Sequence, residues 1–273
     1  MLSSFLLALR EGLEVALILG ILLGALRKIR REELRAVVWS GAASAAALST
    51  ITAVALTGLG ASLEGEAEAI FEGLTMLLAA GVLTWMIFWM RRQARGLKGA
   101  LEADVRRATL RNGKRALFVL ALVTILREGV ELALFLTAAV FTTSAGQTLS
   151  GAALGLALAF LLGWLLFASI IKLDLRRFFL VTGILLVLFA AGLIAHGVHE
   201  LNEVGWIPAV VEHVWDVNFV LDEASIPGQL LKALFGYNGN PSLSEVLAYT
   251  GYFAAILLYL RRSAVPLPAP GRA

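Results

Sequence analysis

The sequence contains no cysteine, which excludes a disulfide framework and any metal site built from thiolates. Histidine is scarce as well, with 3 residues that all lie between positions 196 and 213. Charged residues make up only 16% of the chain, whereas a soluble domain usually carries about 25%. The sequence shows neither a nucleotide-binding loop nor a nucleophile–base pattern, so we do not expect an enzyme or an ATP-driven pump.

Apolar residues are abundant instead, at 59% of the chain, with a mean hydropathy of +0.83. They form seven blocks of roughly the 20 residues that a helix needs to cross a bilayer. The blocks are 2–26, 36–60, 70–90, 116–142, 149–171, 178–199 and 245–260. Over most of their length they lack the polar stripe of a soluble helix. We therefore predict an all-α polytopic membrane protein with seven transmembrane helices in one domain over residues 1–262.

The first block lacks a basic start and carries Arg10, Glu11 and Glu14 in its middle, so we expect a first span and not a cleavable signal peptide. Basic residues fall on alternate loops. Of the 23 Lys and Arg residues, 20 lie at 27–35, 91–115, 172–177 or beyond 260. The positive-inside rule then places the N-terminus outside and the C-terminus in the cytoplasm, with a disordered tail at 263–273. The net charge of +3 reflects this topology and does not indicate nucleic-acid binding.

The opposite side of the membrane is predicted to be acidic, and an acidic surface concentrates cations. His196, His199, Glu200 and Glu203 would line one face if the sixth helix continues, as a first-contact metal site or as an amphipathic helix end. Glu72 would either cap the third span or face the same pathway. The long outer loop at about 200–244, which precedes the seventh helix at about 245–260, could form a small lid.

An Arg-Glu-Gly-x-Glu motif occurs twice, at 10–14 and at 127–131, an offset of 117 residues. The motifs lie in spans one and four, which run in opposite directions across the membrane. Residues of about 1–91 and 114–200 would then form two inverted repeats. Transporters built in this way hold their substrate near the bilayer midplane, and rocking of the repeats would expose it to either side.

The motifs bring carboxylates into the membrane on matching helix faces. Glu11 and Glu14 share one face of the first span, as do Glu128 and Glu131 on the fourth. Arg10 and Arg127 could each pair with the glutamate four positions on. Two arginines against four glutamates leave a formal charge of −2, which a structural salt-bridge lock would not need. A bound multivalent cation would remove this charge, as would protonation of two carboxylates.

Small residues accompany both motifs. Gly12 and Gly129 begin ridges of small side chains that let helix backbones approach closely. If the two ridged helices cross, the four carboxylates can converge on one point. Oxygen ligands suit a hard cation, but they do not select among iron, manganese, calcium and magnesium.

At these residues the sequence resembles the oxidase-dependent high-affinity iron permease family, which includes fungal iron permeases and bacterial ferrous-iron uptake permeases. The resemblance covers roughly residues 1–260. It extends to Phe71–Gly73, Leu83–Met90, His196–Leu201, Trp215–Asp216 and Gly236–Tyr237. The acidic outer-loop motif of the fungal members has only a scrambled likeness here, at Asp222–Ser225.

The resemblance implies that the chain is an iron uptake permease of the cytoplasmic (inner) membrane, embedded in the lipid bilayer. Its four motif glutamates would bind iron as the transported substrate, Arg10 and Arg127 would orient them, and no organic cofactor is expected. Periplasmic iron-handling proteins or a ferroxidase are the implied partners. Two alternatives remain open: a proton-coupled transporter for another divalent metal, and a membrane di-iron oxidase. The oxidase is disfavoured because neither motif has the Glu-x-x-His pattern of di-iron bundles.

Overall fold

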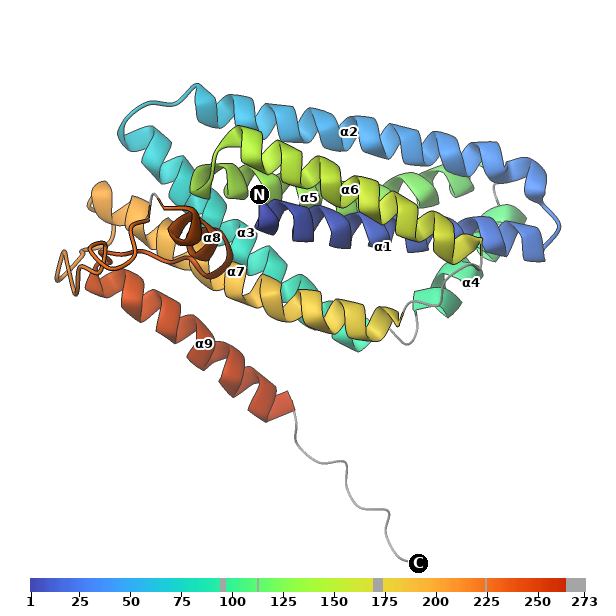
Figure 1. Cartoon of the computed structure of the whole chain (residues 1–273). Helices are drawn as coiled ribbons and strands as arrows, with labels where there is room; N and C mark the ends of the chain where they lie inside the picture. Colours follow the sequence, from blue (N-terminus) through green and yellow to red (C-terminus); the bar gives the residue numbers. More distant parts are fainter. Residues whose placement is uncertain (94–96, 112, 169–173, 224, 264–273) are drawn as a thin grey trace, which may run out of the picture.

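A computed structural model describes residues 1–93, 97–111, 113–168, 174–223 and 225–263, and all the regular structure in these ranges is helical (Figure 1). The elements are α1 (Leu2–Lys28), η1 (Glu32–Leu34), α2 (Arg35–Ala61), α3 (Glu66–Gln93), α4 (Leu97–Arg111), α5 (Lys114–Thr142), α6 (Ala145–Phe167), α7 (Leu175–Glu203), α8 (Ile226–Phe235) and α9 (Leu243–Ser263). The predicted tail at 263–273 lies outside the described residues, except for Ser263.

The long helices follow the apolar blocks of the sequence. α1, α2, α3, α5, α6, α7 and α9 begin and end within four residues of the predicted spans. Five of them, α2, α3, α6, α7 and α9, are long and apolar enough to cross a membrane. α1 and α5 are equally long, but each carries three charged motif residues in its middle. The described part of the chain therefore contains five helices that qualify as membrane spans by length and composition. The two others, α1 and α5, qualify only if their charged residues are shielded from lipid.

Two further helices occupy segments that the sequence analysis treated as loops. α4 is amphipathic: Leu101 and Val105 lie one turn apart and are buried in the apolar cluster formed with α1, α2 and α5. An ion pair between Lys28 and Glu102, 3.1 Å apart, also links α4 to the end of α1. α8 begins at the Ser225 cap, whose hydroxyl accepts the Gly228 N–H. Short amphipathic helices of this kind lack the continuous apolar run on which span prediction relies.

The helices pack mainly in three pairs that join distant parts of the chain. α1 packs most extensively against α6, α2 against α5, and α3 against α7, while α1 also contacts α5. Gly12 of α1 faces Ala159 of α6, and Gly129 of α5 faces Ser49 of α2. The same correspondence relates Gly151 beside Met1 and Phe5 to Gly41 beside Phe118 and Leu122. In each correspondence, the residue at α1 and its counterpart on α5 are 117 positions apart, and the residue on α6 and its counterpart on α2 are 110 positions apart.

The third pair, α3 and α7, makes a symmetric contact through one glycine on each helix. A Cβ added to Gly73 of α3 would lie 3.0 Å from the Gly197 carbonyl oxygen, and one added to Gly197 of α7 would lie 3.0 Å from that of Gly73. Leu201, four residues after Gly197, lies beside the Gly73 position, and Leu77, four residues after Gly73, lies beside the Gly197 position. The α3–α7 crossing therefore has matching surroundings on its two sides.

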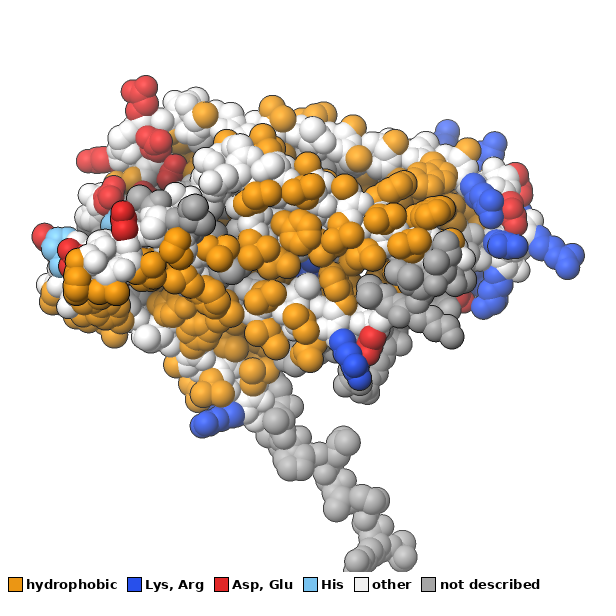
Figure 2. Space-filling view, viewed as in Figure 1, with side chains coloured by type: hydrophobic (Ala, Val, Ile, Leu, Met, Phe, Trp, Pro, Cys, Tyr) orange, Lys and Arg blue, Asp and Glu red, His pale blue; other side chains and the backbone are white. Residues whose placement is uncertain are grey.

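Charged side chains separate to the two ends of the helix bundle. Figure 2 shows Lys and Arg gathered at the end where α1 meets η1, and Asp and Glu at the opposite end, near the start of α3 and the end of α7. A broad band of apolar side chains lies between these ends. The pattern matches a bundle with its long axis across a membrane, with the basic end expected in the cytoplasm.

The segment between α7 and α9 folds back over the acidic end of the bundle. α8 contacts α7 most, and it also contacts α1 and α5 (Figure 1). Glu223 ties this segment together, because it pairs with Lys232 at 3.3 Å and accepts the Gly239 N–H at 2.7 Å. The Tyr237 hydroxyl also donates to the Leu221 carbonyl at 2.8 Å. The predicted outer loop is thus a structured cap that includes a helix.

The cap is seated on α7 through two glycines. Gly236 ends α8 with φ +66°, and its backbone lies so close to Gly192 that a Cβ on Gly192 would stand 2.6 Å from the Gly236 Cα. We expect Gly192→Ala to shift the cap and to lower the free energy of unfolding by about 1–3 kcal/mol, since backbone cannot swing aside as a side chain can. Thermal unfolding and proteolysis within 204–242 would measure this change. Gly81→Ala is the control, because its Cβ would meet nothing within 4 Å. Equal effects in the two variants would contradict this view of the contact.

Candidate functional site

Three carboxylates meet where α1 and α5 cross. Glu11 from α1 and Glu128 and Glu131 from α5 each place a carboxylate oxygen within 4.8 Å of the other two. Their residues are only 1%, 5% and 8% exposed. Among the described residues, these are the His, Cys, Asp or Glu side chains found close enough together to hold a metal ion. Three such oxygens suit a hard divalent cation that keeps some of its water.

The carboxylate group is poorly satisfied by the protein itself. Both oxygens of Glu11 are buried and have no hydrogen-bond partner among the described residues. One oxygen of Glu128 and one of Glu131 are in the same state. Buried polar atoms are normally hydrogen-bonded, and an unpaired buried carboxylate is especially costly. A bound cation, or protons shared between the carboxylates, would supply the missing partners.

Glu14 is held differently from its three neighbours. It forms an ion pair with Arg10, with 3.2 Å between Glu14 Oε1 and Arg10 Nε, and the two do not align as a hydrogen bond. Arg10 is 1% exposed, and its Nη2 lies 2.9 Å from the Met90 sulfur on α3. The predicted four-glutamate group therefore appears in this structure as three carboxylates, with the fourth paired beside them.

Arg127 has a more open environment than its counterpart Arg10. Its Nε donates to Glu131 Oε1 at 2.9 Å and lies 4.0 Å from Glu128. Its guanidinium lies over the Trp89 ring, 4.1 Å from the centroid, and Trp89 stacks on Trp85. The Arg127 side chain is 33% exposed, whereas that of Arg10 is 2% exposed. The two motifs are alike in sequence but differ in how their arginines are satisfied.

The glycine ridges of α1 and α5 do not pack against each other. A Cβ on Gly12 would lie 2.7 Å from the Ala159 side chain of α6, and Gly129 faces Ser49 of α2. The reason is angular. Neighbouring helix positions differ by about 100°, so a glycine that follows a glutamate points to a different helix. Gly12 and Gly129 therefore seat α1 against α6 and α5 against α2.

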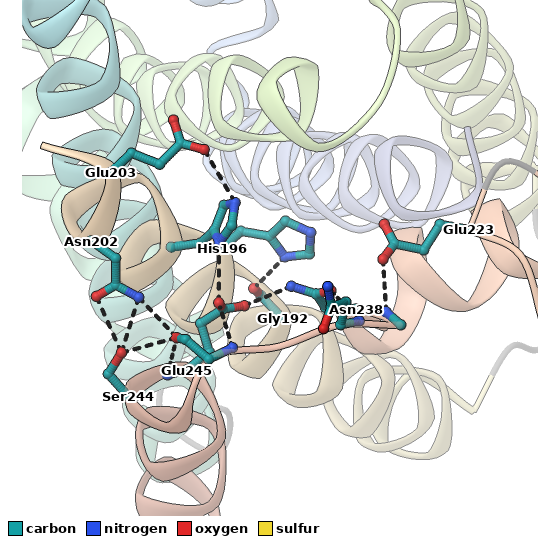
Figure 3. Close-up of polar contacts among 12 residues, drawn as sticks. Gly192, His196, Asn202, Glu203, Glu223, Asn238, Ser244 and Glu245 are labelled. Carbon is teal, nitrogen blue, oxygen red and sulfur yellow. Dashed lines mark hydrogen bonds and ion pairs between the residues drawn. The ribbon is translucent and has the colours of Figure 1, made fainter. Parts of the chain in front are cut away.

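The acidic end of the bundle carries a separate polar network around Glu245 (Figure 3). Glu245 Oε1 lies 3.0 Å from His199 Nδ1 and accepts the Ser242 N–H, while Oε2 accepts from Asn238 at 2.8 Å. The Glu245 N–H donates to the Ser242 hydroxyl in return, which completes a capping box at the start of α9. The network attaches α9 to the end of α7.

The residues predicted for an outer metal site lie near one another, but among the described residues they do not bring three ligand atoms as close together as the buried carboxylates do. His199 lies between Glu245 and Glu203, with its Nε2 3.4 Å from the Glu203 carboxylate. His196 places Nδ1 3.0 Å from the Gly192 carbonyl, which can only accept, so Nδ1 is the donor in this contact. Glu72 of α3 lies within electrostatic range of Glu200 and Glu203 of α7. Recruitment of metal by these side chains stays a prediction.

Several residues around the site were not assigned a role from the sequence. Met90, Trp85 and Trp89 belong to the α3 segment that resembles the iron permease family, but nothing in their spacing shows that they contact the arginines. Glu245 could have been found from its capping-box spacing, Ser-x-x-Glu, ahead of an apolar run.

Comparison with known proteins gives a consistent result. The family model described as "Iron permease FTR1 family" matches residues 1–265. The chain is 35% identical over 260 residues to the ferrous iron permease EfeU of Escherichia coli O157:H7, covering 94% of each chain. It is 32% identical over 265 residues to EfeU of Yersinia pestis, covering 95% of this chain and 94% of the relative. A relative from Escherichia coli K12, also 35% identical, is named a putative inactive ferrous iron permease.

No solved structure matches the chain. The family model spans the two motifs, the α3 segment and the outer cap, and its relatives match along nearly their whole length. Together with the apolar helices, these matches identify a multi-pass protein of the inner membrane. The chain belongs to the iron permease FTR1 family.

Proposed function

We propose that this chain is a high-affinity iron uptake permease, which moves iron across the inner membrane past carboxylates near the middle of the bilayer. The family, the names of its relatives and the buried carboxylates of α1 and α5 support this function. Glu11, Glu128 and Glu131 would hold the ion, and Glu14 would complete a four-glutamate site when it separates from Arg10.

Glu11 is the observation that carries the proposal. A helix-locking salt-bridge network would give this carboxylate a cationic partner, yet no side chain in the described part of the chain pairs with it in this way. It lies instead beside two further carboxylates. A divalent cation at this point would offset their mutual repulsion and replace the missing partners. The group contains no histidine, which is a further reason to favour transport over di-iron oxidase chemistry.

We also propose seven transmembrane helices in a single domain over residues 1–262, with the N-terminus outside and the C-terminus in the cytoplasm. α1 and α5 can cross the membrane because five of their six motif charges, all but Arg127, are buried inside the bundle. The basic and acidic ends of the molecule support the orientation (Figure 2). The corresponding contacts of Gly12 and Gly129 support two inverted repeats, at about 1–91 and 114–200.

The helix pairs suggest which parts would move. Rocking of one contiguous repeat against the other would break the extensive α1–α6 and α2–α5 contacts. Each of these pairs combines one helix from each repeat. We therefore propose the pairs themselves as the moving units. Since Glu11 lies on one pair and Glu128 and Glu131 on the other, motion between the pairs would open and close the site.

Reconstitution tests the substrate directly. Proteoliposomes that contain the full chain should accumulate ferrous iron under anaerobic conditions, with saturable kinetics that protein-free liposomes do not show. Excess unlabelled iron should compete, and manganese and calcium should compete less well. Uptake of manganese or calcium without iron would overturn the assignment of iron and leave the architecture standing.

A further inference from the structure

Two buried hydroxyl groups at the start of α1 have no partner. Ser3 is 1% exposed and Ser4 is 0% exposed, and neither hydroxyl makes a hydrogen bond to any described residue. Many other hydroxyls on the long helices bond to a carbonyl three or four residues earlier, as Thr137 does to Ala133 at 2.9 Å. Ser3 and Ser4 lie in the first turn of α1, where the helix offers no such carbonyl.

These hydroxyls share a helix face with the carboxylates. Ser4 precedes Glu11 by seven positions and Ser3 precedes Glu14 by eleven, so each pair differs by only about 20° around the helix. The hydroxyls lie about 10 Å or more nearer the outer end than the carboxylates, at 1.5 Å per residue. Leu7, which is fully buried, lies between them on this face. From the outer end inward, this face of α1 carries the two serine hydroxyls, then Leu7, and then the carboxylates of Glu11 and Glu14.

On the cytoplasmic side of the carboxylates, the same face of α1 carries apolar side chains. Below Glu14 the same face continues with Ile18 and Leu22, which are buried in an apolar cluster with residues of α2, α4 and α5. The position on α5 that corresponds to Ser4 at the 117-residue offset is Ala121, which is 0% exposed within that cluster. Unpartnered hydroxyls thus occur on the outer side of the site, and the equivalent inner position is apolar.

We propose that Ser3 and Ser4 form an outer hydroxyl station on the transport pathway, where an arriving hydrated divalent cation is bound before it passes Leu7 and reaches Glu11. Hydroxyl oxygens are hard ligands that replace water around such an ion or hydrogen-bond to the water that it keeps. The helix dipole of α1 is unfavourable to a cation here. The antiparallel helix α5 ends nearby and opposes this effect with its C-terminus. α8, which contacts α1 and α5, covers this end of the bundle in the present structure.

The cysteine-free chain allows a direct test, which rests on the proposed function. Ser4→Cys introduces a single thiol of nearly the same size into an otherwise thiol-free protein. A membrane-impermeant thiol reagent added outside spheroplasts should modify it. Ferrous iron at ten times its half-saturating concentration should slow the modification about tenfold. Ala121→Cys is the matched control and should stay unmodified, while the exposed Ser62→Cys should react whether or not iron is present.

Uptake provides the second measurement. The double variant Ser3→Ala with Ser4→Ala should lower iron uptake at limiting iron about tenfold, the loss expected for hydrogen bonds to a charged ligand. Its thermal stability should be unchanged or higher, because it removes two unsatisfied hydroxyls. The proposal is overturned if Ser62→Cys reacts and Ser4→Cys does not, if iron leaves the Ser4→Cys rate unchanged, or if the double variant transports normally. In the last case, uptake by the parent and its loss in Glu11→Gln would show that the proposed function still holds.

Discussion

Glu11→Gln should abolish iron uptake, with a fall of about 100-fold or more relative to the parent protein, since weaker changes around metal ligands already cost 10–100-fold. The substitution keeps the size of the side chain but removes its charge. It also points an amide group, which can donate hydrogen bonds, toward the carboxylates of Glu128 and Glu131. Initial rates of radioactive iron uptake into proteoliposomes measure the loss directly.

The same variant should fold at least as well as the parent. Both oxygens of Glu11 are buried without a partner, so the neutral side chain removes a cost of the folded state. Glu33→Gln is a suitable control, because the Glu33 side chain is 60% exposed at the basic end of the bundle. It should transport iron normally. Unchanged uptake by Glu11→Gln would remove Glu11 from the pathway, and lower stability of this variant would indicate a structural role instead.

Arg10→Met should have the largest effect on folding. Arg10 is 1% exposed, and it is the cation that pairs with the buried Glu14. Removal of one partner of a buried ion pair leaves the other charge uncompensated, which costs roughly 3–5 kcal/mol. We therefore expect a lower thermal unfolding temperature in detergent and less folded protein in the membrane. The added change Glu14→Gln should recover most of this loss, because it neutralises the stranded carboxylate.

Arg127→Met is the matched comparison for Arg10→Met. The Arg127 side chain is one-third exposed and is shared between Glu131 and the Trp89 ring. More exposed ion pairs contribute less, at about 1 kcal/mol or below. Arg127→Met should therefore lower the free energy of unfolding by much less than Arg10→Met does. Equal losses in the two variants would contradict the difference in burial on which this prediction depends.

The sequence predicted the long helices well, because each is an apolar block bounded by charged or turn-forming residues. The convergence of Glu11 with Glu128 and Glu131 was also foreseeable from the repeated motif, since two antiparallel spans bring matching positions to one depth. The helical character of α4 and α8 was missed, because their few buried side chains, such as Leu101 and Val105, leave no continuous apolar signal.

The details of the site could not be read from the sequence, because they depend on which helices become neighbours. Helix spacing allowed both Arg10–Glu14 and Arg127–Glu131 pairs, and both are present. It could not show that one arginine is enclosed and the other open. For the same reason the spacing could not show that Gly12 packs on α6 and Gly129 on α2, since it identifies a helix face but not the helix that packs on it.

The exchanged pairing of the helices has a consequence for how the protein is made. α1 and α2 leave the ribosome first, but their most extensive partners, α6 and α5, are synthesised much later. Until α5 and α6 are made, the motif charges of α1 lack the neighbouring helices that bury them in the finished bundle. An N-terminal half that ends after α3 should therefore remain loosely assembled and open to quality-control proteases. The permease would become a stable entity only late in its biogenesis, when the second half of the chain interlocks with the first.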